Sequence, residues 1–488
     1  MAFVDLRKAF DRVWREGLWA VLEEKGLGGK FLSIVKGIYS GHKRKIDIGN
    51  DQTEWIDCRR GVKQGCCLSP VLFAIYLADL GTRLKATKGV KMGNATIPGI
   101  FFADDMIQTA ETVDDLGHQL AILRDFVTER RLEINFQKTQ IMKLGQGCGD
   151  KNTWTLTDGQ GTELGRIEET NFYDYLGVRL GRSRTFQQYR TQKQKQIPRK
   201  LGLLKVKSRN TPSRTRAANA MWRQAVKPAL LYGAELVTYT KEWTDKMESL
   251  QSKIARWILG VRRTTPPAGL RAELGWNSIE DDIEERKMAY WERLIRLPEE
   301  RWTKQALHEV LKGQFRSEWY EKLIKARGKV VSDPIATRSR HWKGALKRVW
   351  RAKGRTDWKK IKQTNTVLAP HPKENIQGSG DHIWLDSKKS RNLNKLRLGD
   401  FGAKWGADKG VCKSCDQDNI RDMRAHLLLD CTKYQDLRTN GPVGTKISEC
   451  GALNMTRVET IQEILAGTSS ANMEHLYNIA TAWEADQI

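Results

Sequence analysis

The chain has few acidic residues and few cysteines for its length, and both shortages limit the classes of protein to which it can belong. Its 488 residues include 58 Asp and Glu against 84 Lys and Arg, which gives a formal charge of +26 at pH 7. Such a surplus predicts salt-dependent attraction to a polyanion, although it does not separate an enzyme from a binding protein. Eight cysteines in so long a chain do not suggest a disulfide scaffold, so we expect free thiols in a reducing compartment.

Long apolar runs are also missing. No uninterrupted apolar stretch approaches the ~20 residues of a membrane helix, and the opening MAFVDLRKAF mixes charges with apolar residues, unlike a secretory signal. We therefore expect an intracellular protein that is neither secreted nor held in a membrane. Nuclear entry stays open, because the basic clusters fit either an import signal or RNA binding.

Two acidic sites stand far apart in the sequence, each beside a short apolar run. Asp5 follows the run AFV, and Asp104 and Asp105 interrupt the run GIFFADDMIQ. Apolar arms around a polar pair predict a β-hairpin with the pair at its tip. Carboxylates from two elements are the ligands that a pair of magnesium ions needs for phosphoryl transfer. We expect Asp5 and Asp104 to be the principal ligands and Asp105 to assist; the alternative is that the pair marks only an exposed turn.

A glycine-bearing loop, RRGVKQGCCLSP, leads from residue 59 into an apolar helix. Gly65 permits close approach of the backbone, Gln64 offers an amide, and Pro70 suits the first helical turn. We expect this loop to support a template base or an incoming nucleotide. An ordinary loop before a helix is the alternative.

Five motifs, in order, resemble those of the reverse transcriptase of non-LTR (LINE-type) retrotransposons. They are the segment around Asp5, QGCCLSP at residues 64–70, FADD at 102–105, LEINFQKTQIM at 132–142 and YDYLGVRL at 173–180, the last resembling a primer-grip hairpin. The resemblance implies an α+β polymerase palm, with an antiparallel sheet and helices, over residues 1–180. It also implies an RNA-directed DNA polymerase that uses two Mg²⁺ ions to transfer nucleotides from dNTPs to a primer 3'-hydroxyl. Its partners would be the RNA template, the DNA primer or target, and the dNTPs.

The resemblance assigns roles to single residues. It gives the metal ions to the three acidic residues named above: Asp5, Asp104 and Asp105. Lys138 would stabilise or protonate the departing pyrophosphate, and a solvated lysine is the alternative there. Phe10 would be the steric gate that excludes a 2'-hydroxyl, and core packing is its alternative. Gln64 and Gly65 would shape the nucleotide and template pocket.

The family places fingers segments, and in many elements an endonuclease, before the first aspartate. Four residues precede Asp5. We therefore expect a chain truncated at its N-terminus, with both parts missing. The alternative function is accordingly a catalytically inactive nucleic-acid-binding remnant.

After the palm the sequence becomes strongly basic. The stretch from Gly181 to Lys227 contains fourteen Lys and Arg and no Asp or Glu. It resembles the family's thumb, which holds the template-primer duplex by its phosphates. We expect a basic helical thumb and connection region over residues 181–368, and a merely solvated basic face is the alternative. The residues expected to contact phosphates are Arg190, Lys193, Lys195 and Arg199.

Two patterns within the basic region predict helices. Apolar residues recur every three or four positions from Trp243 to Trp257, and Gly260 ends the run, which is typical of an amphipathic helix. A helical pattern resumes after TTPPAG, at residues 264–269. The basic stretch 338–362 then carries three tryptophans spaced by eight, a spacing that suits inward packing and leaves base stacking as the alternative.

The C-terminal part begins with a linker at residues 369–380, where proline, glycine and serine occur without periodicity. We expect a zinc-knuckle module over residues 381–440 and a short tail over 441–488. Four residues of the module have Cys-x2-Cys-x10-His-x4-Cys spacing: Cys412, Cys415, His426 and Cys431. Three thiolates and one imidazole predict a closed, structural Zn²⁺ site. The pattern also resembles the C-terminal knuckle of the same family.

Overall fold

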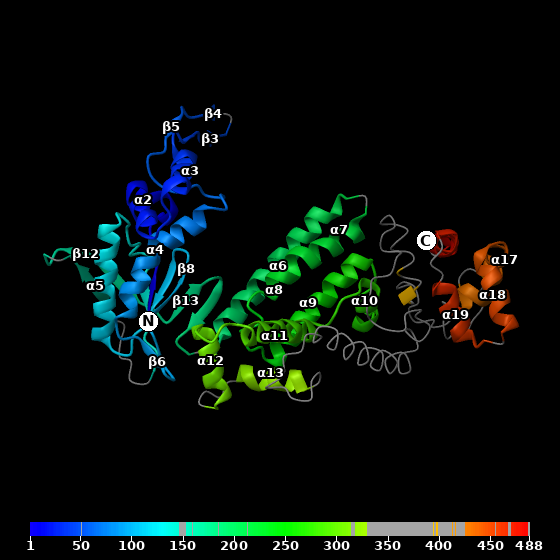
Figure 1. The fold of residues 1–488 in the computed structure, drawn as a ribbon. Coiled ribbons are helices and arrows are strands. Elements are labelled where there is room, and N and C mark those ends of the chain that lie inside the picture. Colours follow the sequence, from blue (N-terminus) through cyan, green and yellow to red (C-terminus); the bar gives the residue numbers. More distant parts are fainter. Residues whose placement is uncertain are drawn as a thin grey trace. The chain divides into compact units, whose positions relative to one another are not determined.

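The computed structural model describes residues 1–328, except 50, 146–152, 159, 184, 212 and 314–317, and then 394, 397–398, 412, 415 and 425–486, except 454 and 467–469. The chain divides into two compact units. The first comprises Met1–Tyr189 and Leu297–Phe315, and the second Arg190–Arg296 and Arg316–Ile488 (Figure 1). The expected linker at 369–380 and the tryptophan-bearing stretch at 338–362 lie outside the described residues.

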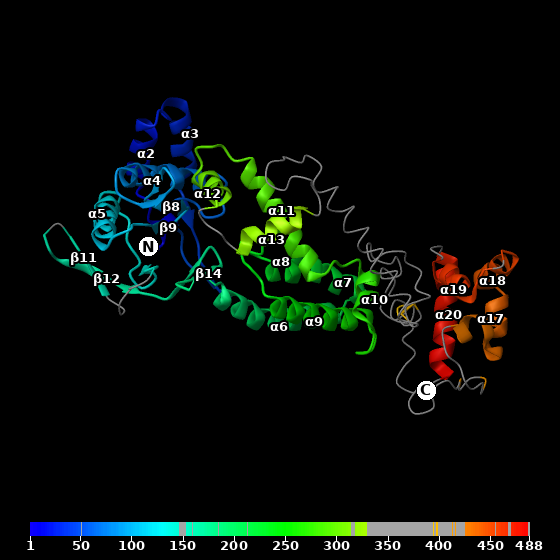
Figure 2. The same cartoon turned by 90° about the horizontal axis from the view of Figure 1, so that it is seen from below.

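A six-stranded sheet forms the centre of the first unit, with strand order β11-β12-β10-β1-β9-β8. The strands are β1 (Ala2–Val4), β8 (Gly99–Phe102), β9 (Asp105–Gln108), β10 (Gln140–Ile141), β11 (Thr153–Thr157) and β12 (Glu163–Glu169). β1 lies between β9 and β10 and is antiparallel to both. β10 and β12 are parallel, because the chain runs back along β11, at the sheet edge, before it enters β12 (Figure 2). The expected antiparallel sheet is confirmed for the other strand pairs.

The two faces of the sheet are covered differently. Ala2 and Val4 belong to a core built with several helices, among them α2 (Arg15–Glu24), α4 (Ser69–Lys85) and α5 (Val113–Glu129). Phe3, between them, belongs to a second cluster that includes Tyr173 of a small hairpin. That hairpin consists of β13 (Phe172–Tyr175) and β14 (Val178–Gly181). Alternation along β1 therefore gives the sheet a helix-covered face and a hairpin-covered face.

The rest of the first unit surrounds this sheet. Between the short helix α1 (Ala9–Arg12) and α4, the chain forms α3 and two small hairpins that project from the sheet (Figure 1). These elements are α3 (Gly29–Tyr39), β2 (Lys43–Arg44) with β5 (Ile56–Asp57), and β3 (Asp47–Ile48) with β4 (Asp51–Gln52). A further hairpin, β6 (Val90–Met92) with β7 (Ala95–Ile97), packs against α12 (Trp302–Leu311).

The second unit is helical in its described part. Its first eight helical elements are α6 (Gln187–Arg209), α7 (Arg214–Met221), the π-helical turn η1 (Trp222–Val226), α8 (Lys227–Leu230), α9 (Lys241–Leu259), α10 (Pro267–Leu274), α11 (Ile279–Ile295) and α13 (Glu318–Gly328). The Thr240 side chain caps α9 at its start, and Gly260, at φ 70°, ends it in the left-handed conformation that favours glycine. The predicted amphipathic helix is thus confirmed. None of the described helices is both long enough and apolar enough to cross a lipid bilayer.

Residues 441–488 were expected to be a short tail, and this expectation is wrong for the described part. After η3 (His426–Asp430) and η4 (Thr432–Tyr434), the chain forms α17 (Gln435–Thr439), α18 (Pro442–Ala452), α19 (Arg457–Ala466) and α20 (Ser470–Asp486). Val443, Ile464 and Ile479 share one core with Cys412 and Cys431. These helices are needed because a small cysteine-histidine module has too little apolar surface for a core of its own.

The glycine-bearing loop is tied to the start of the chain through its backbone. The amide of Gly61 donates to the carbonyl oxygen of Val13, and the amide of Val62 to that of Phe10, both at 2.8 Å. The buried guanidinium of Arg15 donates to the carbonyl oxygen of Gly61 at 3.0 Å. Gly61 has φ 84°, and a Cβ there would stand 2.7 Å from a backbone oxygen. Only glycine fits this crossing without moving the backbone.

We expect Gly61→Ala to destabilise the first unit by about 2–4 kcal/mol, as the sum of left-handed strain and steric overlap. Gly65→Ala is the matched control, because Gly65 has a similar φ of 81° but no heavy atom within 4 Å of the added Cβ. The control should lose only the strain, about 1–2 kcal/mol. Both losses of unfolding free energy are measured by urea unfolding, with hydrogen exchange at the amides of β9 as the probe of the first unit. Equal losses in the two variants would show that the close approach of Gly61 to the neighbouring backbone does not contribute to stability.

Candidate active site and metal centre

β1 and β9 bring Asp5 and Asp105 to one place. Val4 pairs with Met106 in the antiparallel register, so the residues one step beyond, Asp5 and Asp105, lie opposite each other. Side chains alternate along a strand, so Asp5 shares the sheet face of Phe3 and Asp105 that of Ile107. Phe3 and Ile107 both belong to the cluster under the β13–β14 hairpin. Two neighbouring strands therefore present carboxylates on the same face of the sheet.

Asp104 lies at the tip of the β8–β9 hairpin, as the sequence predicts. Phe102 pairs with Asp105, which leaves Ala103 and Asp104 as a two-residue turn. Ala103 has φ 53°, a left-handed conformation that such turns use and that alanine rarely adopts. Backbone strain of this kind is concentrated at functional sites. The turn thus places a third carboxylate next to the pair formed by Asp5 and Asp105.

The charges of this region act on one another. Burial raises the pKa of Asp105, the charges of Asp104 and Asp5 raise it further, and Lys138 opposes the shift. Burial also raises the pKa of Tyr173 to about 12, with added contributions from Asp5 and Asp105. Clustered carboxylates repel each other and favour a bound cation. Among the described residues these carboxylates do not form a closed ligand set, so an ion would have to draw their oxygens together.

Two residues that the sequence analysis missed hold Asp5 in place. Asn135 donates its side-chain amide to Oδ2 of Asp5 and its backbone amide to the carbonyl oxygen of Asp5, both at 2.9 Å. The backbone amide of Asp5 donates to Oγ1 of the buried Thr139 at 3.2 Å. Both partners flank the exposed Lys138 in the segment LEINFQKTQIM. The available signal for Asn135 was its place between two apolar residues, whereas Thr139 lies between polar neighbours and gave no such signal.

The predicted nucleotide-pocket residues lie on α1 and on the glycine-bearing loop. The Phe10 ring stacks on Phe73, with centroids 4.7 Å apart, and packs at the border of the helix-side core. Core packing therefore accounts for one face of this half-buried ring. Gln64 is exposed and donates to Oδ2 of Asp11 at 3.3 Å, and Gly65 is exposed as well. The loop beside Phe10 is open to a ligand at these two residues.

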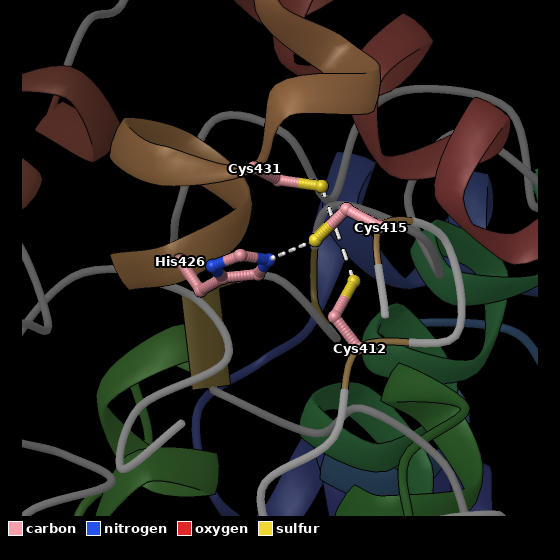
Figure 3. Close-up of side chains that lie close together, drawn as sticks. All are labelled: Cys412, Cys415, His426 and Cys431. Atoms are coloured by element: carbon pink, nitrogen blue, oxygen red, sulfur yellow. Dashed lines mark hydrogen bonds between the residues drawn. The ribbon is translucent and has the colours of Figure 1, made fainter. Parts of the chain in front are cut away.

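The four predicted zinc ligands converge in the second unit (Figure 3). Their ligand atoms all lie within 4.8 Å of one another. Sγ of Cys412 is 3.9 Å from Sγ of Cys431, and Sγ of Cys415 is 3.3 Å from Nε2 of His426. A tetrahedral zinc with bonds of ~2.3 Å separates its sulfur ligands by about 3.8 Å. The donor set and its spacing therefore fit a four-coordinate zinc with no open position.

The surroundings of these four side chains also suit a structural site. Cys412, His426 and Cys431 are buried. Burial raises the pKa of Cys431 to about 12, and Cys412 adds to the shift. Burial disfavours the thiolate form of Cys431. A bound cation would favour that form again, because metal ligands bind as thiolates.

The four predicted phosphate-contacting residues on α6 divide into two pairs. Lys195 and Arg199 are exposed. Lys193 is 8% exposed, and its ammonium donates to a backbone carbonyl oxygen at 2.9 Å. The structure does not favour the expected phosphate contact of Lys193, because this residue lies four residues before the buried Ile197 and shares its inward face. Arg190 is half-buried, and its guanidinium donates to another carbonyl oxygen at 2.7 Å.

Comparison with known proteins agrees with the motifs. Residues 1–180 match the family model described as reverse transcriptase (RNA-dependent DNA polymerase). The chain is 26% identical over 302 residues to the RNA-directed DNA polymerase from mobile element jockey of Drosophila funebris, covering 60% of this chain and 32% of that protein. It is 29% identical over 185 residues to the Retrovirus-related Pol polyprotein from type-1 retrotransposable element R2 of Nasonia vitripennis, covering 36% and 18%. The resemblance to retrotransposon reverse transcriptases is confirmed, and the chain spans a third or less of the length of these relatives.

The raised pKa of Asp105 leads to a prediction about stability. The unfolded chain loses this proton at a lower pH than the folded chain, so ionised Asp105 destabilises the fold at neutral pH. Asp105→Asn should therefore raise the urea midpoint of the first unit at pH 7. The gain should shrink as the pH falls and disappear below the ordinary pKa of 3.8, where both states hold the proton.

Asp174→Asn is the matched control for this measurement. It makes the same change of charge at a carboxylate that accepts hydrogen bonds from Arg179 at 2.8 and 2.6 Å. We expect no gain from it at pH 7. An equal gain from both variants would attribute the effect to net charge and not to the Asp105 site.

Proposed function

Because residues 1–180 match the reverse transcriptase family, we propose that this chain acts as an RNA-directed DNA polymerase of a non-LTR retrotransposon. It would transfer a nucleotide from a dNTP to a primer 3'-hydroxyl on an RNA template. The observation that supports this most is the placement of three carboxylates. Asp5 and Asp105 share one face of the sheet, and Asp104 occupies the adjoining turn.

In this proposal the three aspartates hold two Mg²⁺ ions. The ions supply activation of the attacking hydroxyl and neutralisation of the leaving pyrophosphate. Asn135 and Thr139 position Asp5 through hydrogen bonds on both sides of its backbone. The exposed Lys138, which acts electrostatically on Asp105, stabilises the pyrophosphate as it leaves.

The pocket residues select the substrate. Phe73 stacks on one face of the Phe10 ring and fixes the ring's orientation. The exposed part of the ring would collide with a 2'-hydroxyl of the incoming nucleotide. Gln64 and Gly65 shape the pocket on the neighbouring loop. The backbone amide of Val62 donates to the carbonyl oxygen of Phe10, which places this loop beside α1.

The second unit would bind the nucleic acid and hold the zinc. On α6, the exposed Lys195 and Arg199 are the residues proposed to contact phosphates, in a stretch that has no acidic residue. The cysteine-histidine set is proposed to bind one structural Zn²⁺. Zinc would link Cys412 and Cys415 to His426 and Cys431, next to the core that α18, α19 and α20 complete.

Primer extension on an RNA template with Mg²⁺ tests the polymerase. We expect incorporation by the native chain and a loss of about 100-fold or more in Asp104→Asn, the scale on which a single electrostatic stabiliser acts. Asp125→Asn is the matched control, since this carboxylate is 61% exposed and pairs with Arg124 at 2.7 Å. It should keep native activity.

Two other outcomes of this assay have definite meanings. Equal activity in the native chain and in Asp104→Asn would contradict the assigned metal site. RNA binding without incorporation in any variant would support the nucleic-acid-binding remnant in place of the polymerase.

The zinc site gives a separate prediction. Metal analysis of the purified chain should find one Zn²⁺ per chain, and Cys431→Ser should lower that content. Removal of zinc by a chelator should unfold the knuckle and expose its core, because metal binding supplies folding free energy in small modules. Cys450→Ser is the control, since Cys450 is buried but stands outside the ligand set. A chain that keeps its C-terminal helices without zinc would contradict the structural role.

A further inference from the structure

A cavity of about 390 Å³ lies in the second unit, lined by residues of α9, α11 and α13. α11 packs against both of the other helices. The charged residues around the cavity are four lysines and two glutamates: Lys241, Lys287, Lys322, Lys325, Glu280 and Glu284. The cavity therefore carries a surplus of positive charge. The first turn of α9, with its positive helix end, adds to it.

Lys287 is the buried member of this set. It lies on α11 and is 5% exposed. Within the described part of the chain, no oxygen accepts a hydrogen bond from its ammonium. Burial, and then Lys322 on α13, lower its pKa to about 8, against the opposing charges of Glu318 and Glu284. An ammonium in this position is costly unless something pairs with it.

The other buried lysines of the described chain show what is unusual here. Lys193 is 8% exposed, and its ammonium donates to a carbonyl oxygen at 2.9 Å. Lys304 is 6% exposed, and its ammonium is 3.6 Å from a carboxylate oxygen of Glu299. Both buried charges are thus compensated by the protein. Lys287 instead borders a cavity, so its partner must come from outside the described chain.

The neighbouring cations are held around the same space. Lys322 donates to the carbonyl oxygen of Tyr239 at 2.9 Å and pairs with Glu318 at 2.6 Å. These contacts hold Lys322 at the cavity and pair Glu318 with a lysine other than Lys287. Lys325 is exposed. A ligand entering the cavity therefore meets several ammonium groups before it reaches Lys287.

We propose that this lysine cavity binds a phosphate group, with the ammonium of Lys287 as its innermost donor. A phosphate carries several acceptor oxygens and enough negative charge to compensate a buried lysine. It can reach the cavity as a free polyphosphate or as part of a nucleic-acid strand. If the phosphate belongs to a nucleic-acid strand, the inference rests on the proposed function. If it belongs to a free polyphosphate, the inference is independent of that function.

The test measures the reactivity of Lys287 in the full chain. Acetylation of single lysines is followed by peptide mass spectrometry, without ligand, with inorganic pyrophosphate, and with a single-stranded RNA oligonucleotide. A ligand at ten times its dissociation constant leaves about one site in ten free, so acetylation of Lys287 should slow about tenfold. Protection by both ligands indicates a free phosphate site, and protection by RNA alone indicates a phosphodiester site. Lack of protection by either ligand, with RNA still bound by the chain, would overturn the proposal.

Lys287→Met supplies the second measurement, because methionine keeps the apolar stem and removes the charge. Lys246→Met is the matched control: Lys246 lies on α9, is 56% exposed and pairs with Glu242 outside the cavity. Of the two substitutions, only Lys287→Met should weaken binding of the ligand that protects Lys287. The ratio of native to Lys287→Met affinity should fall as the pH rises above about 8, where Lys287 loses its proton.

Equal weakening by both substitutions, or a ratio independent of pH, would overturn the proposal. Each variant is first checked by thermal unfolding, and the labelling of native Lys287 does not depend on either variant. Neither the labelling nor the binding measurements use primer extension. Failure of the polymerase proposal and failure of the cavity proposal are therefore distinguishable.

Discussion

The pairing of β1 with β9 is the constraint on which the candidate active site depends. Register decides the face on which every side chain of a strand emerges, and a slip of one residue would move Asp5 to the helix-covered face. The register is held by apolar side chains on both sides: Val4 in the core under the helices and Phe3 under the β13–β14 hairpin. Packing on two faces thus determines where the carboxylates meet.

Buried polar groups then connect elements that are distant in sequence. Arg15 joins the glycine-bearing loop to the N-terminal segment, and Asn135 joins the segment after α5 to Asp5. Arg15 donates to a backbone carbonyl oxygen of the loop, whereas Asn135 donates to both the carboxylate and the backbone carbonyl oxygen of Asp5. Lys287 differs from Arg15 and Asn135, because no oxygen of the described residues accepts a hydrogen bond from its ammonium.

The two candidate metal centres differ in how far folding has assembled them. The cysteine-histidine set is closed and buried, as a structural zinc requires. The charges of Asp5 and Asp104 raise the pKa of Asp105, yet the three carboxylates do not form a closed ligand set among the described residues. In the proposed function, an ion brought by the substrate could enter and leave the aspartate site, whereas a zinc bound by the cysteine-histidine set would be enclosed by the core that α18–α20 share.

The sequence by itself determined the motifs, the hairpin at Asp104 and Asp105, the helix that ends at Gly260, and the spacing of the candidate metal ligands. All of these depend on local periodicity, turn chemistry or short separations. Only the tertiary structure decided that Lys193 faces inward, that Asn135 holds Asp5, that the last helices complete the knuckle core, and that Lys287 borders a cavity. These features depend on contacts between distant segments, and a composition or a periodic pattern carries no record of which segments meet.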